Sequence, residues 1–138
     1  TLNRMYTILG NIERIGDHAM NICGYTRMIE KQGITFSKEV RIEIDEMKEV
    51  CKKALDYLGE IHHDQQEDNQ DMKAIEKFEQ QIDDMTDDYR KKQLIRMQNG
   101  TCSEEGCIIY SEMLTDFERI GDHILNIGQE MGLGKVGA

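Results

Sequence analysis

The sequence predicts an all-α protein built from four long antiparallel helices. Its 138 residues contain no proline and no tryptophan, and apolar residues recur at steps of three and four rather than two. This spacing places apolar side chains along one face of a helix, whereas a strand would require strict alternation. A chain of this length holds one ordinary hydrophobic core, so we expect one compact domain.

The first predicted helix runs from about Leu2 to Lys31 and ends at Gly33. Its apolar residues recur every three or four positions, which predicts one stripe facing the core. The predicted stripe consists of Met5, Leu9, Ile12, Gly16, Ala19 and Cys23.

The second predicted helix begins after an N-cap at Thr35 or Ser37 and frays near His62. Residues 63–70 contain no apolar side chain, which predicts a turn there. The residues expected to face the core are Val40, Ile44, Met47, Cys51, Leu55, Leu58 and Ile61.

The third and fourth helices are separated by Asn99 and Gly100, because glycine readily takes the left-handed conformation that ends a helix. Residues 101–104 fit a capping box, so the fourth helix is expected from Ser103 to about Met131. Short connections make consecutive helices antiparallel. The inward residues of the third helix are predicted to be Ile75, Phe78, Ile82, Met85 and Tyr89.

An internal repeat relates the first helix to the fourth. Residues 12–22 return as residues 117–127, with eight of eleven positions identical. The repeating unit therefore spans three helices. Residues 1–33 are interpreted as the last helix of a truncated unit, and residues 36–138 as one complete unit of the same compact domain. Since the chain opens at Thr1 inside a helical pattern, we expect a fragment of a longer polypeptide.

Each copy of the repeat reads Glu-x-x-x-Asp-x-x-x-Asn, and four residues turn a helix by about 400°, so the three polar side chains form a nearly axial row. The third helix carries a further Glu-x-x-x-Asp. If the third and fourth helices pack antiparallel, their carboxylates face each other across a groove. Such oxygen-rich groups suit iron, zinc or another divalent metal. The candidate ligands are Glu13, Asp17, Glu79, Asp83, Glu118 and Asp122.

A solvated acidic surface is the alternative to a metal site. The pair Asp45 and Glu49 has the same spacing but projects opposite its own core, and chance explains the single pair on the third helix equally well. Near-verbatim repetition favours a shared role for the other two pairs, although Gly16 and Gly121 also fit close helix contacts. His18 and His123 project about 100° from the preceding Asp, which favours surface or interface positions over ligation of the same ion.

Charge and cysteine content narrow the functional classes. The formal charge is −10, with the acidic excess in residues 39–88, which disfavours binding to nucleic acid or anionic lipid. No apolar run of membrane length and no export leader are evident, so a cytoplasmic location is expected.

The four cysteines show neither zinc-finger nor disulfide spacing and are interpreted as small, half-buried thiols. No phosphate loop, nucleophile elbow or Cys/His dyad indicates an enzyme.

The strings ERIGDHAMNI (13–22) and FERIGDHILNI (117–127) resemble the signature of the PhoU family. These helical regulators of phosphate uptake consist of two three-helix repeats whose paired E(D)xxxD motifs hold multinuclear iron or other metals. The resemblance implies an up-down bundle and assigns the metal role to the six carboxylates named above. It also leaves Glu13 and Asp17 without their partner helix, which a second copy of the chain would supply in a homodimer.

Residues 96–106, together with Tyr110 and residues 114–119, resemble the PhoU-like cytoplasmic tail of bacterial sodium/phosphate cotransporters. The resemblance implies a regulatory, non-catalytic module at the cytoplasmic face of the inner membrane, with the transporter part of the same polypeptide as its partner. A fragment of a free-standing regulator of a phosphate ABC transporter is the alternative within the family. A di-iron carboxylate protein is the alternative outside it, although only one Glu-x-x-His, at Glu60, is present.

Overall fold

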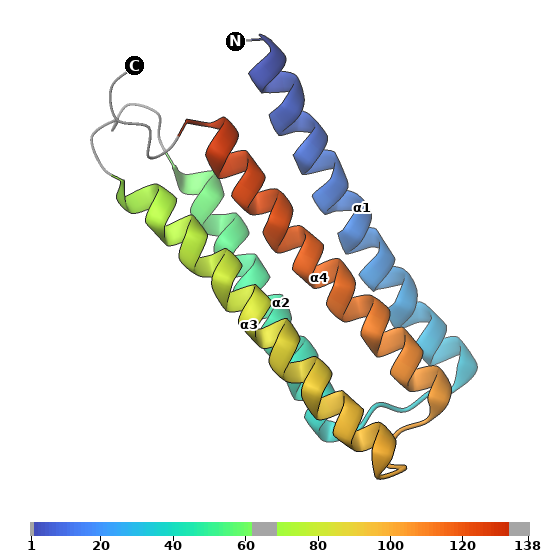
Figure 1. Cartoon of the computed structure of the whole chain (residues 1–138). Helices are drawn as coiled ribbons and strands as arrows, with labels where there is room; N and C mark the ends of the chain where they lie inside the picture. The colour runs from blue at the N-terminus through green and yellow to red at the C-terminus, as the bar shows by residue number, and fades with distance from the viewer. Residues whose placement is uncertain (1, 62–68, 133–138) are drawn as a thin grey trace.

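The computed structural model describes residues 2–61 and 69–132 and confirms the all-α prediction. Four long helices run up and down in a bundle, and the described residues contain no strand (Figure 1). None of these helices is both long enough and apolar enough to cross a membrane. The helices are α1 (Leu2–Gln32), α2 (Lys38–Glu60), α3 (Gln70–Gln98) and α4 (Glu104–Glu130).

Side-chain caps and glycines set the helix ends. The Ser37 hydroxyl accepts a hydrogen bond from the Val40 amide at 3.2 Å and starts α2. Gly33 and Gly100 both have positive φ, 66° and 67°, where a side chain would be strained, and they follow α1 and α3. α2 ends at Glu60, close to the predicted end; the turn predicted at 63–70 lies mostly outside the described residues.

The start of α4 corrects one prediction. Ser103 is the N-cap, and its hydroxyl accepts a hydrogen bond from the Gly106 amide at 3.0 Å. The predicted capping box over 101–104 was wrong, because Thr101 instead donates its hydroxyl to the Arg96 carbonyl at 3.1 Å. Gly106 occupies the position from which a Glu or Gln would complete a box around Ser103, and it has no side chain to do so.

α4 lies in the middle of the bundle. α1 packs on one side of it, and α2 and α3 pack on the other (Figure 1). Buried residues therefore lie on two sides of α4, from Cys107 to Ile127. Among the described helices, α1 packs on α4 alone.

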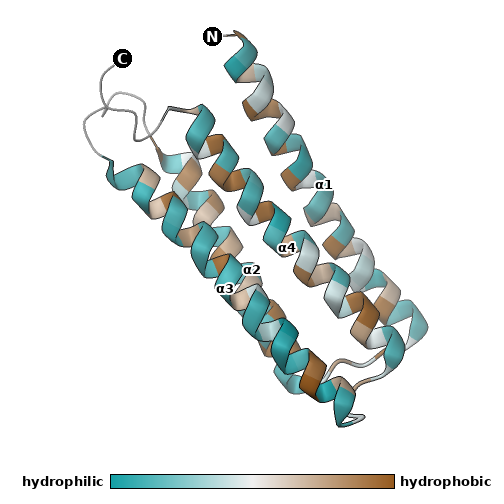
Figure 2. Ribbon diagram, viewed as in Figure 1, coloured by the Kyte–Doolittle hydropathy of each residue, from teal (hydrophilic) through white to brown (hydrophobic). Residues whose placement is uncertain are grey.

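The face of α1 that packs on α4 is not the predicted one. Ile15 and Ile22 are buried against α4, whereas Met5, Leu9 and Ile12 are between half and two-thirds exposed. Gly16, Ala19 and Cys23 are exposed as well. The prediction failed because α1 has two apolar faces, and among the described residues no helix covers the second. Figure 2 shows hydrophobic positions recurring along the whole of α1.

The inward faces predicted for α2 and α3 are mostly correct. Val40, Ile44, Met47 and Cys51 are buried in α2, while Leu58 and Ile61 pack at the edge of the core. Leu55 was predicted wrongly and is exposed, because the buried Val50 and Ala54 complete the inward face of α2. In α3, Ile75, Ile82 and Tyr89 are buried, and Phe78 and Met85 are partly buried against the core.

The cysteines also differ from the prediction. Cys102 and Cys107 form a disulfide, with their Cα atoms 6.4 Å apart. The expectation of four thiols overlooked the turn at Ser103, which folds Cys102 back against the first turn of α4. Cys23 is an exposed thiol and Cys51 a buried one, and burial raises the pKa of the Cys51 thiol well above its ordinary value.

Candidate metal centre

The antiparallel packing of α3 and α4 brings three of the predicted carboxylates together. One oxygen each from Glu79, Asp83 and Asp122 lie within 4.8 Å of one another. Close approach of the two helices makes this arrangement feasible, because a Cβ added at Gly121 would lie only 3.2 Å from Cδ1 of Ile82. Gly121 is therefore a close helix contact, as predicted, whereas a Cβ at Gly16 would meet nothing within 4 Å, contrary to prediction.

Burial and neighbouring carboxylates raise the pKa of two of the three groups, Glu79 and Asp122. Partial burial is the largest cause that raises the pKa of Glu79 to about 7; a hydrogen bond with Asp83 and the charges of Asp83, Asp122 and Glu118 add to it. The pKa of Asp122 is raised by burial and by Asp83. A cation among them would relieve this repulsion, and an all-oxygen donor set fits a hard or borderline ion.

Glu118 lies at the edge of this cluster rather than within it. Its pKa is raised by burial and by the charge of Asp83, and the guanidinium of Arg90 opposes the rise. Arg90 donates hydrogen bonds to the hydroxyls of Ser111 at 3.1 Å and Thr115 at 2.7 Å, which ties α3 to α4. Arg90 thus places a positive charge close to Glu118, between α3 and α4.

Glu13 and Asp17 occupy a different environment. Both are exposed on α1, and neither belongs to a cluster of potential metal ligands in the described part of the chain. The structure thus brings together Glu79, Asp83 and Asp122, with Glu118 close by, and leaves the α1 pair by itself.

The two repeat histidines lie in the α1/α4 interface, one of the placements that the sequence favoured, but their partners Asp116 and Asn11 were not singled out. His18 Nδ1 lies 2.7 Å from Asp116 Oδ1, and His123 Nδ1 lies 2.9 Å from Asn11 Oδ1. The two imidazole rings stack with centroids 5.5 Å apart. Asp116 is the repeat counterpart of Asn11, 105 positions away, and His123 is the counterpart of His18. Each histidine therefore contacts the other copy in the same way, so an approximate two-fold axis relates the repeats. The repeat alignment itself could have identified these pairs.

The asparagines of the repeat belong to this interface as well. Asn21 donates a hydrogen bond to Asp116 at 3.3 Å, and Asn126 donates one to Asn11 at 3.4 Å. The two asparagines therefore contact the neighbouring helix rather than a metal cluster. A step of about 40° per four residues accumulates along the helix and carries each Asn toward the neighbouring helix.

The architecture and the carboxylate cluster define a helical bundle with a candidate metal centre between two of its helices. The chain belongs to the PhoU family, because the PhoU domain matches residues 44–131, more than half of its length. It is similar to the phosphate-specific transport system accessory protein PhoU homolog 1 of Thermotoga maritima, with 28% identity over 134 residues. That match covers 94% of this chain and 56% of the relative, so the chain spans little more than half the relative's length. No solved structure matches the chain.

Proposed function

We propose that this chain is a regulatory, non-catalytic module that controls phosphate uptake at the cytoplasmic face of the membrane. Membership of the PhoU family carries the proposal, and the relative's name, an accessory protein of phosphate-specific transport, supports it. Residues 96–106 favour the tail of a sodium/phosphate cotransporter as its context. A free-standing regulator of a phosphate ABC transporter fits the family match equally well.

Phosphate uptake by cells that carry the parent gene tests this proposal. Deleting residues 1–138 should change the rate of uptake or its response to external phosphate. Dependence of the affected uptake on a sodium gradient would favour the cotransporter, and dependence on ATP would favour the ABC transporter. Unchanged uptake and unchanged response under both conditions would overturn the regulatory role.

We further propose that Glu79, Asp83 and Asp122 bind iron, zinc or another divalent metal, and that the carboxylate of Glu118 lies next to this site. The convergence of three carboxylate oxygens within 4.8 Å carries this proposal. The raised pKa of Glu79 supports it, because close carboxylates without a cation favour a bound proton at one of them. A metal bound there would link α3 to α4 and stabilise the bundle.

Thermal unfolding of chelated protein with and without added zinc or ferrous iron tests the metal site. A metal present at 100 times its dissociation constant stabilises the native state by about 2.7 kcal/mol, which raises the melting temperature by several degrees. Asp83→Asn together with Asp122→Asn should abolish this rise. Asp45→Asn with Glu49→Gln, an exposed pair of the same spacing on α2, is the matched control and should retain it. An equal rise in both double variants would contradict the site.

A second copy of the chain is the proposed partner for the exposed face of α1, where it would complete the site at Glu13 and Asp17. The exposed side chains of Leu2, Met5, Leu9 and Ile12 support this proposal. Light scattering should show a dimer that Leu9→Lys dissociates, whereas Ile108→Lys, an equally exposed position on α4, should leave it intact. A wild-type monomer at high concentration would contradict the dimer.

A carboxylate-bridged di-iron enzyme is the alternative to the proposed regulatory module. It would need a second Glu-x-x-His, and the single copy beginning at Glu60 extends beyond the described residues. Oxygen consumption by protein loaded with ferrous iron separates the two. Repeated turnover would support the enzyme, and its absence would favour the regulatory module.

A further inference from the structure

The disulfide between Cys102 and Cys107 joins the α3–α4 turn to the first turn of α4. Its two sulfurs differ in access. Cys107 is buried at 5% exposure, whereas Cys102 is only partly buried and lines a cleft of about 290 Å³. The α1–α2 connection, including Ile34 and Phe36, forms the opposite wall of this cleft. A small molecule in the cleft would therefore meet Cys102.

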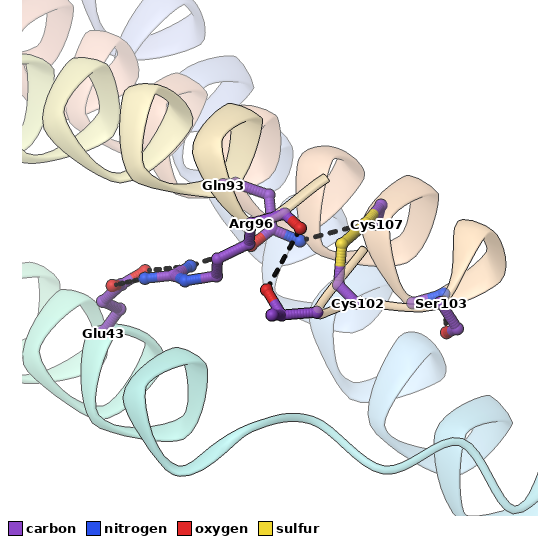
Figure 3. The surroundings of a disulfide bond; sticks show 8 residues. Glu43, Gln93, Arg96, Cys102, Ser103 and Cys107 are labelled. Atoms are coloured by element: carbon purple, nitrogen blue, oxygen red, sulfur yellow. Dashed lines mark hydrogen bonds and ion pairs between the residues drawn. A yellow bond between two sulfur atoms is a disulfide. The ribbon is translucent and has the colours of Figure 1, made fainter. Parts of the chain in front are cut away.

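A buried polar side chain is directed at the other sulfur. Gln93, 6% exposed, donates a hydrogen bond from Nε2 to Sγ of Cys107 at 3.3 Å. Its Oε1 accepts a hydrogen bond from Nη1 of Arg96 at 2.8 Å, which fixes which end of the amide faces the sulfur. Arg96 is itself held by an ion pair with the buried Glu43. Figure 3 shows this chain from Glu43 through Arg96 and Gln93 to the disulfide.

The hydrogen bond from Gln93 strengthens when the sulfur becomes an anion. A hydrogen bond to a charged group is worth roughly twice one to a neutral group, so the bond from Gln93 stabilises the negative charge that develops on Cys107 when the disulfide opens. Cys107 also lies in the first turn of α4, where the helix dipole stabilises negative charge. Because Cys102 lines the cleft and Cys107 is buried, an external thiolate reaches Cys102, and Cys107 is the leaving group.

We propose that Cys102 and Cys107 form a reversible thiol–disulfide exchange site that reacts with low-molecular-weight thiols. A thiolate entering the cleft attacks Sγ of Cys102, the bond between the two cysteines breaks, and its electron pair goes to Sγ of Cys107. A second thiol attacks the external sulfur of the mixed disulfide and releases Cys102. In total the protein gains two electrons and two protons, and two external thiols become one external disulfide.

Exchange at this site changes the connections at one end of the bundle. The oxidised pair bridges the Ser103 cap, so the turn after α3 is covalently fixed to α4. The reduced pair leaves that turn held by hydrogen bonds such as that from Thr101 to the Arg96 carbonyl. Because external thiols reduce the pair and external disulfides oxidise it, the thiol–disulfide ratio around the protein decides whether this turn is covalently fixed.

A redox titration tests the proposal on the wild-type chain. The folded protein is equilibrated with reduced and oxidised dithiothreitol at varied ratios, alkylated, and mapped by mass spectrometry. Cys102 and Cys107 should become labelled together in one two-electron transition while the buried Cys51 stays unlabelled. Labelling of both in fully oxidising buffer overturns the proposal. Protection of both under strong reduction, lost only when Cys51 also reacts, overturns it as well.

Single variants test the roles of the two sulfurs. Oxidised glutathione should modify Cys102 readily in Cys107→Ser, and it should modify Cys107 at least about tenfold more slowly in Cys102→Ser, because burial restricts access. The exposed Cys23 serves as the internal standard in both. Faster modification of Cys107 than of Cys102 would reverse the assignment of attacked sulfur and leaving group, and equal rates would overturn it.

The role of Gln93 is tested separately as a positioning residue. Gln93→Met removes the donor to Cys107, and ionised Gln93→Glu keeps the acceptor for Arg96 while losing that donor. Both should slow reduction of the disulfide by glutathione about tenfold, as expected for one hydrogen bond to a charged group. Wild-type rates in both variants would exclude Gln93 from the exchange.

Discussion

The two copies of the repeat share eight of eleven residues but lie in different surroundings. Residues 117–127 of α4 are packed on two sides, by α1 and by α2 with α3, whereas residues 12–22 of α1 are packed by α4 alone. Ile15 and its counterpart Ile120 are both buried. Gly121 is buried against Ile82, yet its counterpart Gly16 is exposed.

The comparison shows that the repeated motif supplies only half of a site. Asp122 comes within reach of Glu79 and Asp83 because α3 presents a second Glu-x-x-x-Asp at the same level. Asp17, with the same neighbours in sequence, belongs to no such cluster within the described residues, since no described helix presents carboxylates to it. The difference between a carboxylate cluster and a solvated acidic face therefore lies in the neighbouring helix.

Removing a matched pair of apolar side chains should give the largest contrast between the copies. Phe117→Ala empties a position that is 3% exposed, so it should lower the free energy of unfolding by about 3–5 kcal/mol. Ile12→Ala, at the corresponding half-exposed position, should change it by less than about 0.5 kcal/mol when both are measured in the Leu9→Lys background, in which the proposed dimer is dissociated. Urea denaturation measures both. A loss of comparable size at Ile12 would show that the second face of α1 is covered in solution.

Replacing the two repeat glycines by valine should give a smaller difference in the free energy of unfolding, again with the larger loss in α4. Gly121→Val forces a branched side chain against Ile82 and should destabilise the protein by about 1–3 kcal/mol. Gly16→Val meets open space and should gain a few tenths of a kcal/mol, about the difference in helix propensity. Urea denaturation again gives both values. Tolerance of Val at Gly121 would mean that α3 and α4 do not approach closely.

Much of the fold was predictable because the signals that define it are local. Serine caps, glycine terminators and a regular apolar period predicted all four helices, with ends close to those observed. The inward face of α1 was not predictable in the same way. Its two apolar faces have the same spacing, and the choice between them depends on which helices are present to cover each.

The candidate site was predictable in its residue types and less so in its geometry. The spacing identified Glu79, Asp83 and Asp122, because four-residue steps place side chains on successive turns. The stacked histidines and the disulfide were not predicted, since both depend on contacts between segments. His18 meets Asp116 across a helix interface, and Cys102 meets Cys107 only after the turn at Ser103 has formed.

The pH dependence of stability in the metal-free protein should give the smallest difference between the clustered carboxylates of α3 and α4 and the exposed pair on α1. Glu79 has a pKa of about 7 in the folded state and 4.5 as its ordinary value, so between these values the folded state holds a proton that the unfolded chain has released. Stability should therefore fall as pH rises from about 4.5 through about 7, and remain lower above that.

Comparing wild type with Glu79→Gln isolates the contribution of Glu79 to the pH dependence of stability. Burial lowers the pKa of His123, so His123 makes stability rise with pH, but this effect is present in both proteins and cancels in the comparison. Between pH 5 and pH 8, the loss of stability should be smaller in Glu79→Gln than in wild type, by less than about 1 kcal/mol since solvent screens a partly exposed groove. Glu13→Gln, in the other copy's exposed site, should retain the wild-type slope in chelated urea titrations. Identical slopes in all three proteins would show that the carboxylates of α3 and α4 do not interact, and the two copies would then be electrostatically equivalent.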